Sequence, residues 1–183
     1  MPFRILIACA VCYLVFTSTA NAQNRQAFTD GPIIKGFGKV ADVDSDVEIP
    51  EGFEFKIRFD VGRKASVGAI NSSFDSVARL INLHARAGVP IENMDIAIVV
   101  HGSAALDLGN KQFYSARNAG KENGSATAIA TLQKHNVTFY LCGQSAAYQE
   151  VTKNDLLDGV KLGWSAMTIH AILDKQGYSL NPF

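Results

Sequence analysis

The chain has 183 residues, of which 48% are hydrophobic and 19% are charged, and its 17 Lys and Arg residues balance 17 Asp and Glu residues. A chain of this length suits one domain that buries roughly 70% of its unfolded surface. The near-zero net charge argues against nucleic acid or an anionic membrane surface as a partner, because both require a basic face.

Residues 1–22 have the pattern of a secretory signal peptide. Arg4 gives a positive start, Ile5 to Phe16 form an apolar run too short to span a membrane, and Ala20-Asn21-Ala22 is a small-x-small cleavage site. We therefore expect cleavage after Ala22 and a periplasmic or secreted protein. No later apolar run is long enough to cross a bilayer. Two of the three cysteines leave with the leader, so that Cys142 becomes the only thiol.

Residues 23–50 are expected to form an irregular N-terminal arm, because glycines and an acidic run interrupt the apolar residues and leave no helix or strand periodicity. The three aspartates of Asp42–Asp46 have the spacing of a calcium-binding loop. However, Val47 stands where that loop needs Gly, and Phe53 stands where it needs Glu. We predict a solvated turn here and no calcium site.

Residues 51–183 predict a single α/β domain. The alternation of apolar and charged residues over Phe53–Val61 is typical of a half-buried strand and suits the edge of a sheet. A helix follows from Ser72, with its apolar residues on one face, and Gly88 closes it. Met94 to Val100 is almost continuously apolar, which predicts a strand buried on both faces.

The C-terminal half continues the alternation of strands and helices. The expected elements are a helix from Ser125 to about Asn136, a strand over Thr138–Leu141, a short turn or helix at Asp155–Leu157, a short strand at Val160–Leu162, and a helix from Ser165 that Gly177 stops. Strands separated by helices of about ten to fifteen residues imply right-handed crossovers and a parallel sheet.

Reactive side chains follow two of the predicted strands. His101, Gly102 and Ser103 follow the central strand, and Cys142 ends the next one. Because the carboxyl ends of parallel strands meet at one crevice, we expect His101 and Cys142 to be near neighbours. An imidazole beside a thiol can activate it as a nucleophile, and a helix N-terminus after Cys142 would favour the thiolate.

Simpler interpretations remain open for both residues. Cys142 can be a small buried hydrophobe, and His101 can bond only to a neighbouring carbonyl. One Cys and one His supply too few ligands for a metal ion, and the chain has no dinucleotide- or phosphate-binding loop. We therefore predict no metal and no cofactor.

Five segments appear in a fixed order along the chain: Val99–Leu106, Leu132–Lys134, Tyr140–Ser145, Asp155–Lys161 and Ser165–Thr168. In this order they resemble an exported branch of the DsrE/DsrF-like family. The resemblance implies a doubly wound parallel sheet flanked by helices, and assembly as a homotrimer or homohexamer. The best-known members carry persulfide on a cysteine at the tip of a strand, and Cys142 stands at that position. Their sulfur-relay partners are cytoplasmic, whereas this chain is expected to carry a leader for export.

The resemblance leads to a sulfurtransferase-like hypothesis. In it an accessible Cys142 takes sulfane sulfur from a small sulfur compound, and His101 steadies the charge. Glu150, which follows the cysteine segment, is expected to disfavour a thiolate. The expected substrate-binding residues are Gly102, Ser103, Gly143, Gln144 and Ser145, with the N–H groups of Gly143 and Gln144 as a cradle. The alternative is a non-catalytic oligomeric binding or assembly module, with a crevice for a small ligand and a packed thiol.

The last predicted helix also points to self-association. It is apolar around more of its circumference than one sheet face can cover, and Trp164 lies beside it as a large anchor. We expect a homo-oligomer.

Overall fold

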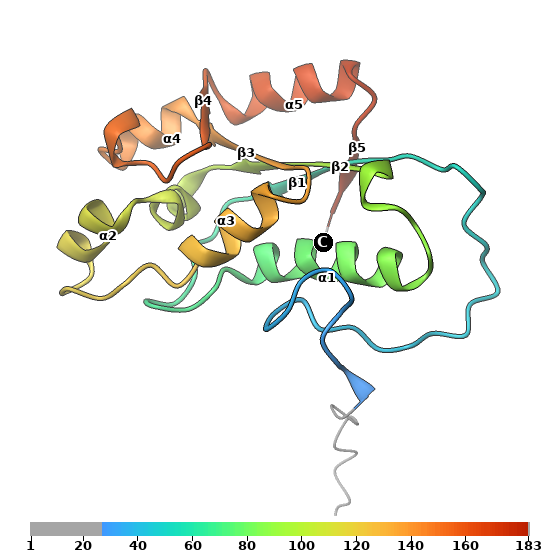
Figure 1. The fold of residues 1–183 in the computed structure, drawn as a ribbon. Helices are drawn as coiled ribbons and strands as arrows, with labels where there is room; N and C mark the ends of the chain where they lie inside the picture. The colour runs from blue at the N-terminus through green and yellow to red at the C-terminus, as the bar shows by residue number, and fades with distance from the viewer. Residues whose placement is uncertain (1–26, 183) are drawn as a thin grey trace, which may run out of the picture.

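The computed structural model describes residues 27–182, so the predicted signal peptide lies outside the described residues. Five parallel strands form one sheet in the order β4-β3-β2-β1-β5 (Figure 1). The strands are β1 (Phe55–Val61), β2 (Met94–Val100), β3 (Val137–Cys142), β4 (Lys161–Gly163) and β5 (Ser179–Asn181). The predicted parallel α/β fold is confirmed.

Helices cover both faces of the sheet (Figure 1). The α-helices are α1 (Ser72–Arg86), α2 (Lys111–Arg117), α3 (Ala126–Gln133), α4 (Gly143–Tyr148) and α5 (Ala166–Lys175). Three 3-10 helices join them: η2 (Ile91–Asn93), η3 (Gly102–Leu108) and η4 (Lys153–Asp155). Helices α1 and α3 lie on one face and α5 on the other, so the sheet is doubly wound. In residues 27–182, no helix has the length and apolar character needed to span a membrane.

The main core lies between the sheet and helices α1 and α3. Phe74 of α1 meets Phe139 of β3 edge to face, with ring centroids 5.2 Å apart. On the opposite face a smaller cluster joins Ala97 and Val99 of β2 to Ile169 and Leu173 of α5. Strand β2 therefore carries apolar side chains toward both layers, as its continuous apolar run predicts.

The sequence predicts β1 at the edge of the sheet, and this prediction is wrong. Strand β5 pairs with the outer side of β1, so that β1 lies inside the sheet. The charged residues of its alternating pattern face α5 instead. Arg58 is buried, forms an ion pair with Asp174 of α5 at 2.9 Å, and donates a hydrogen bond to the carbonyl of Tyr178. The charged residues of β1 thus contribute to a polar contact between the sheet and α5.

The segment before β1 packs on α1. Residues 27–50 contain no named helix or strand, but Ile34 enters the main core with 1% of its surface exposed. The Asn82 side chain of α1 accepts from the N–H of Ile34 at 2.8 Å, and it donates to the carbonyls of Ile34 and Gly38. The predicted division into a 23–50 arm and a 51–183 domain stays a prediction.

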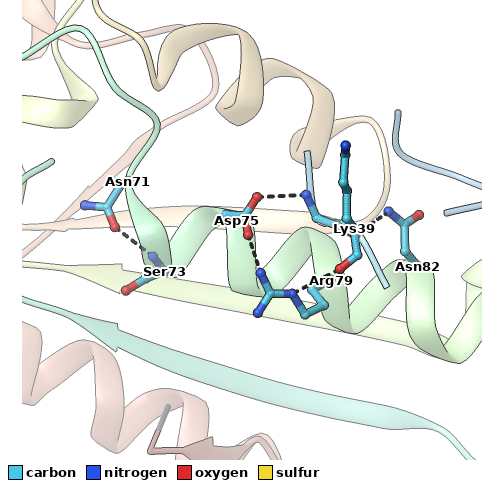
Figure 2. Close-up of polar contacts among 7 residues, drawn as sticks. Lys39, Asn71, Ser73, Asp75, Arg79 and Asn82 are labelled. Carbon is cyan, nitrogen blue, oxygen red and sulfur yellow. Dashed lines mark hydrogen bonds and ion pairs between the residues drawn. The ribbon is translucent and has the colours of Figure 1, made fainter. Parts of the chain in front are cut away.

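Figure 2 shows the exposed part of the same contact. Asp75 accepts from the N–H of Gly38 at 2.8 Å and pairs with Arg79 one helical turn further on, also at 2.8 Å. Arg79 in turn donates to the carbonyl of Lys39. One face of α1 therefore holds the backbone of the N-terminal segment through side-chain hydrogen bonds.

Candidate functional site

The carboxyl ends of β2 and β3 place His101 next to Cys142 in register. Val100 pairs with Leu141, and the backbone stays extended one position further at both His101 and Cys142. Because side chains alternate along a strand, both of these side chains belong to the face that α5 covers. The predicted neighbourhood of the two strand ends is therefore present in the backbone.

The thiol of Cys142 lies where two helices begin. Cys142 is the N-cap of α4, and α5 starts at Ala166. Burial raises the pKa of the Cys142 thiol. Hydrogen bonds from the Ser145 hydroxyl and from the backbone N–H groups of Ser145, Ala166 and Gln144 outweigh this effect, so that the pKa lies below that of an ordinary cysteine.

Gly143 has a different role from the one that the sequence suggests. Its N–H is not among the groups that shift the pKa of the thiol, whereas that of Gln144 is. A Cβ atom at Gly143 would lie 2.5 Å from the carbonyl oxygen of Gly163 and 3.0 Å from that of Trp164. The missing side chain therefore lets the segment that leads into α5 approach α4, and so brings the N–H of Ala166 to the sulfur.

Gly102 and Ser145 connect the two strand ends. The N–H of Gly102 donates to the Ser145 hydroxyl oxygen at 2.9 Å. Ser103 instead holds the loop after β1, because its hydroxyl accepts from the N–H of Lys64 at 3.1 Å and donates to the carbonyl of Gly62 at 3.3 Å. Of the predicted binding residues, Gln144 and Ser145 contact the thiol, and Gly102 acts through Ser145.

His101 contacts a carboxylate rather than the thiol. Its Nε2 lies 3.1 Å from one oxygen of Asp60, whose other oxygen lies 2.8 Å from Nε2 of His170 on α5. The imidazole of His101 also lies over Gly62, where a Cβ would be 2.8 Å from its Cε1. Among the interactions found for residues 27–182, none joins His101 to Cys142, and the predicted role of His101 toward the thiol stays a prediction.

Asp60 and His170 complete a group that the sequence does not reveal. Burial raises the pKa of Asp60, but the hydrogen bonds and charges of His170 and His101 lower it more, so that it lies below the ordinary value. The alternation in β1 shows only that Asp60 faces away from Phe59. His170, in turn, lies on a helix, where a packed or solvated imidazole is expected.

Glu150 does not oppose the thiolate, contrary to the expectation from the sequence. It follows the C-terminal end of α4, whereas Cys142 precedes the N-terminal end. Its carboxylate lies 3.8 Å from Arg117, and it is not among the groups that shift the pKa of the thiol. Among the described residues, no group of three or more His, Cys, Asp or Glu side chains is placed to hold a metal ion.

Comparison with known proteins finds a family match over the segment that contains these residues. A family model described as the DsrE/DsrF-like family matches residues 59–182. The fold is similar to that of the ychN protein from E. coli, with 18% identity, a TM-score of 0.50, and coverage of 69% of this chain and 96% of that one. The protein of unknown function MTH1491 from Methanobacterium thermoautotrophicum matches with 16% identity, a TM-score of 0.47, and coverage of 70% and 98%. The comparison with curated proteins gave no match.

Proposed function

The chain belongs to the DsrE/DsrF-like family, and from this premise we propose that Cys142 carries sulfane sulfur as a persulfide. The observation that supports the proposal most directly is the convergence of N–H groups from α4 and α5 on the sulfur. Backbone N–H groups at helix N-termini favour an anion, and a thiolate is the nucleophilic form of cysteine. The same donors can hold the persulfide anion that would follow.

The reaction needs no cofactor. The Cys142 thiolate attacks the outer sulfur of a donor persulfide, R–S–SH, and forms a new sulfur–sulfur bond. The sulfur–sulfur bond of the donor breaks, and R–S⁻ leaves with that bond's electron pair, so that Cys142 becomes Cys–S–SH. Attack by an acceptor thiolate on the outer sulfur returns Cys142 to a thiolate. Both steps are sulfurtransferase-like, with no net oxidation.

A second function is a non-catalytic binding or assembly module. The observation that favours it is the low exposure of Cys142, only 5% in the described chain, whereas the sulfur hypothesis predicts an accessible thiol. In this case the thiol only packs between α4 and α5, and the crevice holds a small ligand without reacting with it.

Intact mass distinguishes the two functions. Native protein is incubated with polysulfide beside the Cys142→Ser variant, and alkylation is followed before and after denaturation. Gain of sulfur by the wild type, absent in Cys142→Ser, would support the persulfide function. A wild-type protein that takes up no sulfur and resists alkylation until it is denatured would contradict the persulfide function and support the binding module.

We also propose that the protein is exported. The positive start, apolar run and Ala-x-Ala ending of residues 1–22 support cleavage after Ala22. The mass of protein isolated from cells should then place Gln23 at the N-terminus. An intact Met1, or lipid attached to Cys9, would contradict export by this route.

A further inference from the structure

Resting on the proposed sulfur function, we propose that Asp60 is a positioning residue for Cys142. Its carboxylate binds His101 at the end of β2 and His170 on α5, and so fixes both neighbours of the thiol. The two bonds differ in what they hold. One places an imidazole beside the thiol in register, and the other holds the helix whose first N–H binds the sulfur.

The path from Asp60 to the thiol follows one face of α5. Ala166, His170 and Asp174 are four residues apart and therefore share a face of the helix. The N–H of Ala166 binds Cys142, His170 binds Asp60, and Asp174 binds Arg58. Of the two side-chain contacts on this face, the one between His170 and Asp60 lies closer to Ala166, and so to the sulfur, than the one between Asp174 and Arg58.

The apolar cluster that holds α5 on the sheet is small, so the polar contacts also contribute to the position of the helix. Of its residues only Ile169 and Leu173 are buried, and they pack on Ala97 and Val99. The partly buried Tyr140, Ala166 and Tyr178 complete this small cluster. A helix held by so small an apolar contact can shift if a polar contact is lost. A shift of the first turn would withdraw the N–H of Ala166 from the sulfur.

The same carboxylate fixes the proton positions of both imidazoles. An ionised carboxylate only accepts hydrogen bonds, so Nε2 of each ring must be a donor in these contacts. A neutral His101 then has its lone pair at Nδ1, in a side chain that is 34% exposed. Asp60 therefore selects Nδ1 of His101 as the nitrogen that can exchange a proton with a substrate at the strand ends.

Other charged or titratable groups lie on the same side of the sheet or next to it. From β1 and the loop after it come Arg58, Arg63 and Lys64. From the remaining elements come Asp95, Tyr140, Cys142, Lys161, Asp174 and Tyr178. None of these groups is among the causes that shift the pKa of Asp60; within the described residues, the side chains that do so are His101 and His170.

The test measures the pKa of Cys142 by the ultraviolet absorbance of its thiolate during a pH titration. Each protein is compared with the same protein carrying Cys142→Ser, so the readout needs no reagent to reach the sulfur and cancels the tyrosines. We expect Asp60→Asn and His170→Asn each to raise the midpoint by about one pH unit, which is about a tenfold loss of thiolate below the midpoint. The matched comparison Asp174→Asn removes a carboxylate from the same face of α5, but its contact with Arg58 lies one helical turn further from Ala166 than the contact of His170, so it should shift the midpoint less than either variant.

The sign of the shift separates positioning from simple charge. Loss of a negative charge near a thiolate would by itself lower the midpoint, because a like charge disfavours the ionised form. A lower or unchanged midpoint in both Asp60→Asn and His170→Asn, with urea unfolding showing folded protein, would overturn the proposal. Sulfur uptake is scored separately. Uptake with no midpoint shift removes only the role of Asp60, and a midpoint shift with no uptake removes only the sulfur function.

Discussion

The backbone N–H of Gly102 donates a 2.9 Å hydrogen bond to the hydroxyl oxygen of Ser145 and thereby joins the end of β2 to α4. Because this bond occupies a lone pair of the hydroxyl, the hydroxyl hydrogen is directed elsewhere, and it is donated to the sulfur of Cys142. The pKa of the thiol thus depends on a contact between residues 43 positions apart in the sequence.

Removing the hydroxyl in Ser145→Ala should raise the pKa of Cys142. A hydrogen bond to a charged group contributes about 1.5–3 kcal/mol, which corresponds to roughly one to two pH units. The thiolate absorbance measures the midpoint. Ser103→Ala is the matched control, because its hydroxyl holds the loop at Gly62 and Lys64 and not the sulfur. An equal shift in both variants would mean that the strand ends move and that the Ser145 donor has no specific effect.

The lowered thiol pKa should also appear in the pH dependence of stability. A group whose pKa is lower in the folded state stabilises the fold above its unfolded pKa, near 8.5 for cysteine, and this contribution is lost as the pH falls through the folded value. Relative to Cys142→Ser, the wild type should therefore gain free energy of unfolding as the pH rises through that window. Urea unfolding of both proteins at a series of pH values measures the difference, and a constant difference would contradict the lowered pKa.

The parts of the fold that could be predicted carry a strong local pattern. Met94–Val100 is apolar at nearly every position, and the Phe74 face of α1 repeats at helical spacing, so both elements are visible in the sequence. Ser179–Asn181 has no such pattern and is a strand only because it pairs with β1. Helix α2 is not among the predicted elements, because it is only seven residues long. Its N-cap is Asn110, whose side chain accepts from the N–H of Phe113 at 3.0 Å.

The same distinction applies to the site. Cys142 and Ser145 are close in the chain, and a cysteine at a strand end before a glycine can be recognised locally. Asp60 and His170 are 110 residues apart, and only the position of α5 over β1 brings them together. No spacing rule links them, because their contact depends on the layer packing and not on one element.

Asp107 is a buried carboxylate that should be replaceable by a neutral amide. It is 2% exposed and accepts from the N–H of Ala65 at 2.8 Å and from the Asn71 side chain at 2.7 Å. Burial raises the pKa of Asp107, and these hydrogen bonds offset the rise only in part. The wild type therefore loses free energy of unfolding as the pH rises from the pKa of the unfolded state, about 3.9, through the higher pKa of the folded state. Asp107→Asn keeps an acceptor without the charge and should not show this loss.

Chemical unfolding of Asp107→Asn and Asp107→Ala tests this behaviour. We expect the advantage of Asp107→Asn over the wild type to grow across that pH window and then level off. Asp107→Ala should instead lose about 2–4 kcal/mol, because the buried Asn71 amide and the partly buried N–H of Ala65 lose their acceptor. Equal losses in both variants would show that the charge itself is required.

Asn82 should hold the N-terminal segment in place. Its fully buried side chain bonds to the backbone of Ile34 and Gly38, so Asn82→Ala leaves buried polar groups unpaired at a cost of about 3 kcal/mol. Limited proteolysis should then cut within residues 27–50. Arg79→Ala on the same helix is the control, and because its ion pair is exposed it should cost less than about 1 kcal/mol. Cleavage no faster than in the wild type would contradict this role of Asn82.

Self-association should depend on the outer surface of α5. Trp164, just before α5, and Met167 on α5 are 84% and 80% exposed, and Ile172 of α5 is half exposed, so large apolar side chains face outward in the isolated chain. We predict a homotrimer or homohexamer that buries them, and the double variant Trp164→Glu with Met167→Glu should dissociate it, since a central aromatic anchor contributes about 2 kcal/mol or more. Light scattering measures the mass of each form. Val47→Glu alters an equally exposed apolar residue of the N-terminal segment and should leave the oligomer intact. A wild-type monomer at micromolar concentration, or dissociation by Val47→Glu alone, would mean that α5 is not the interface.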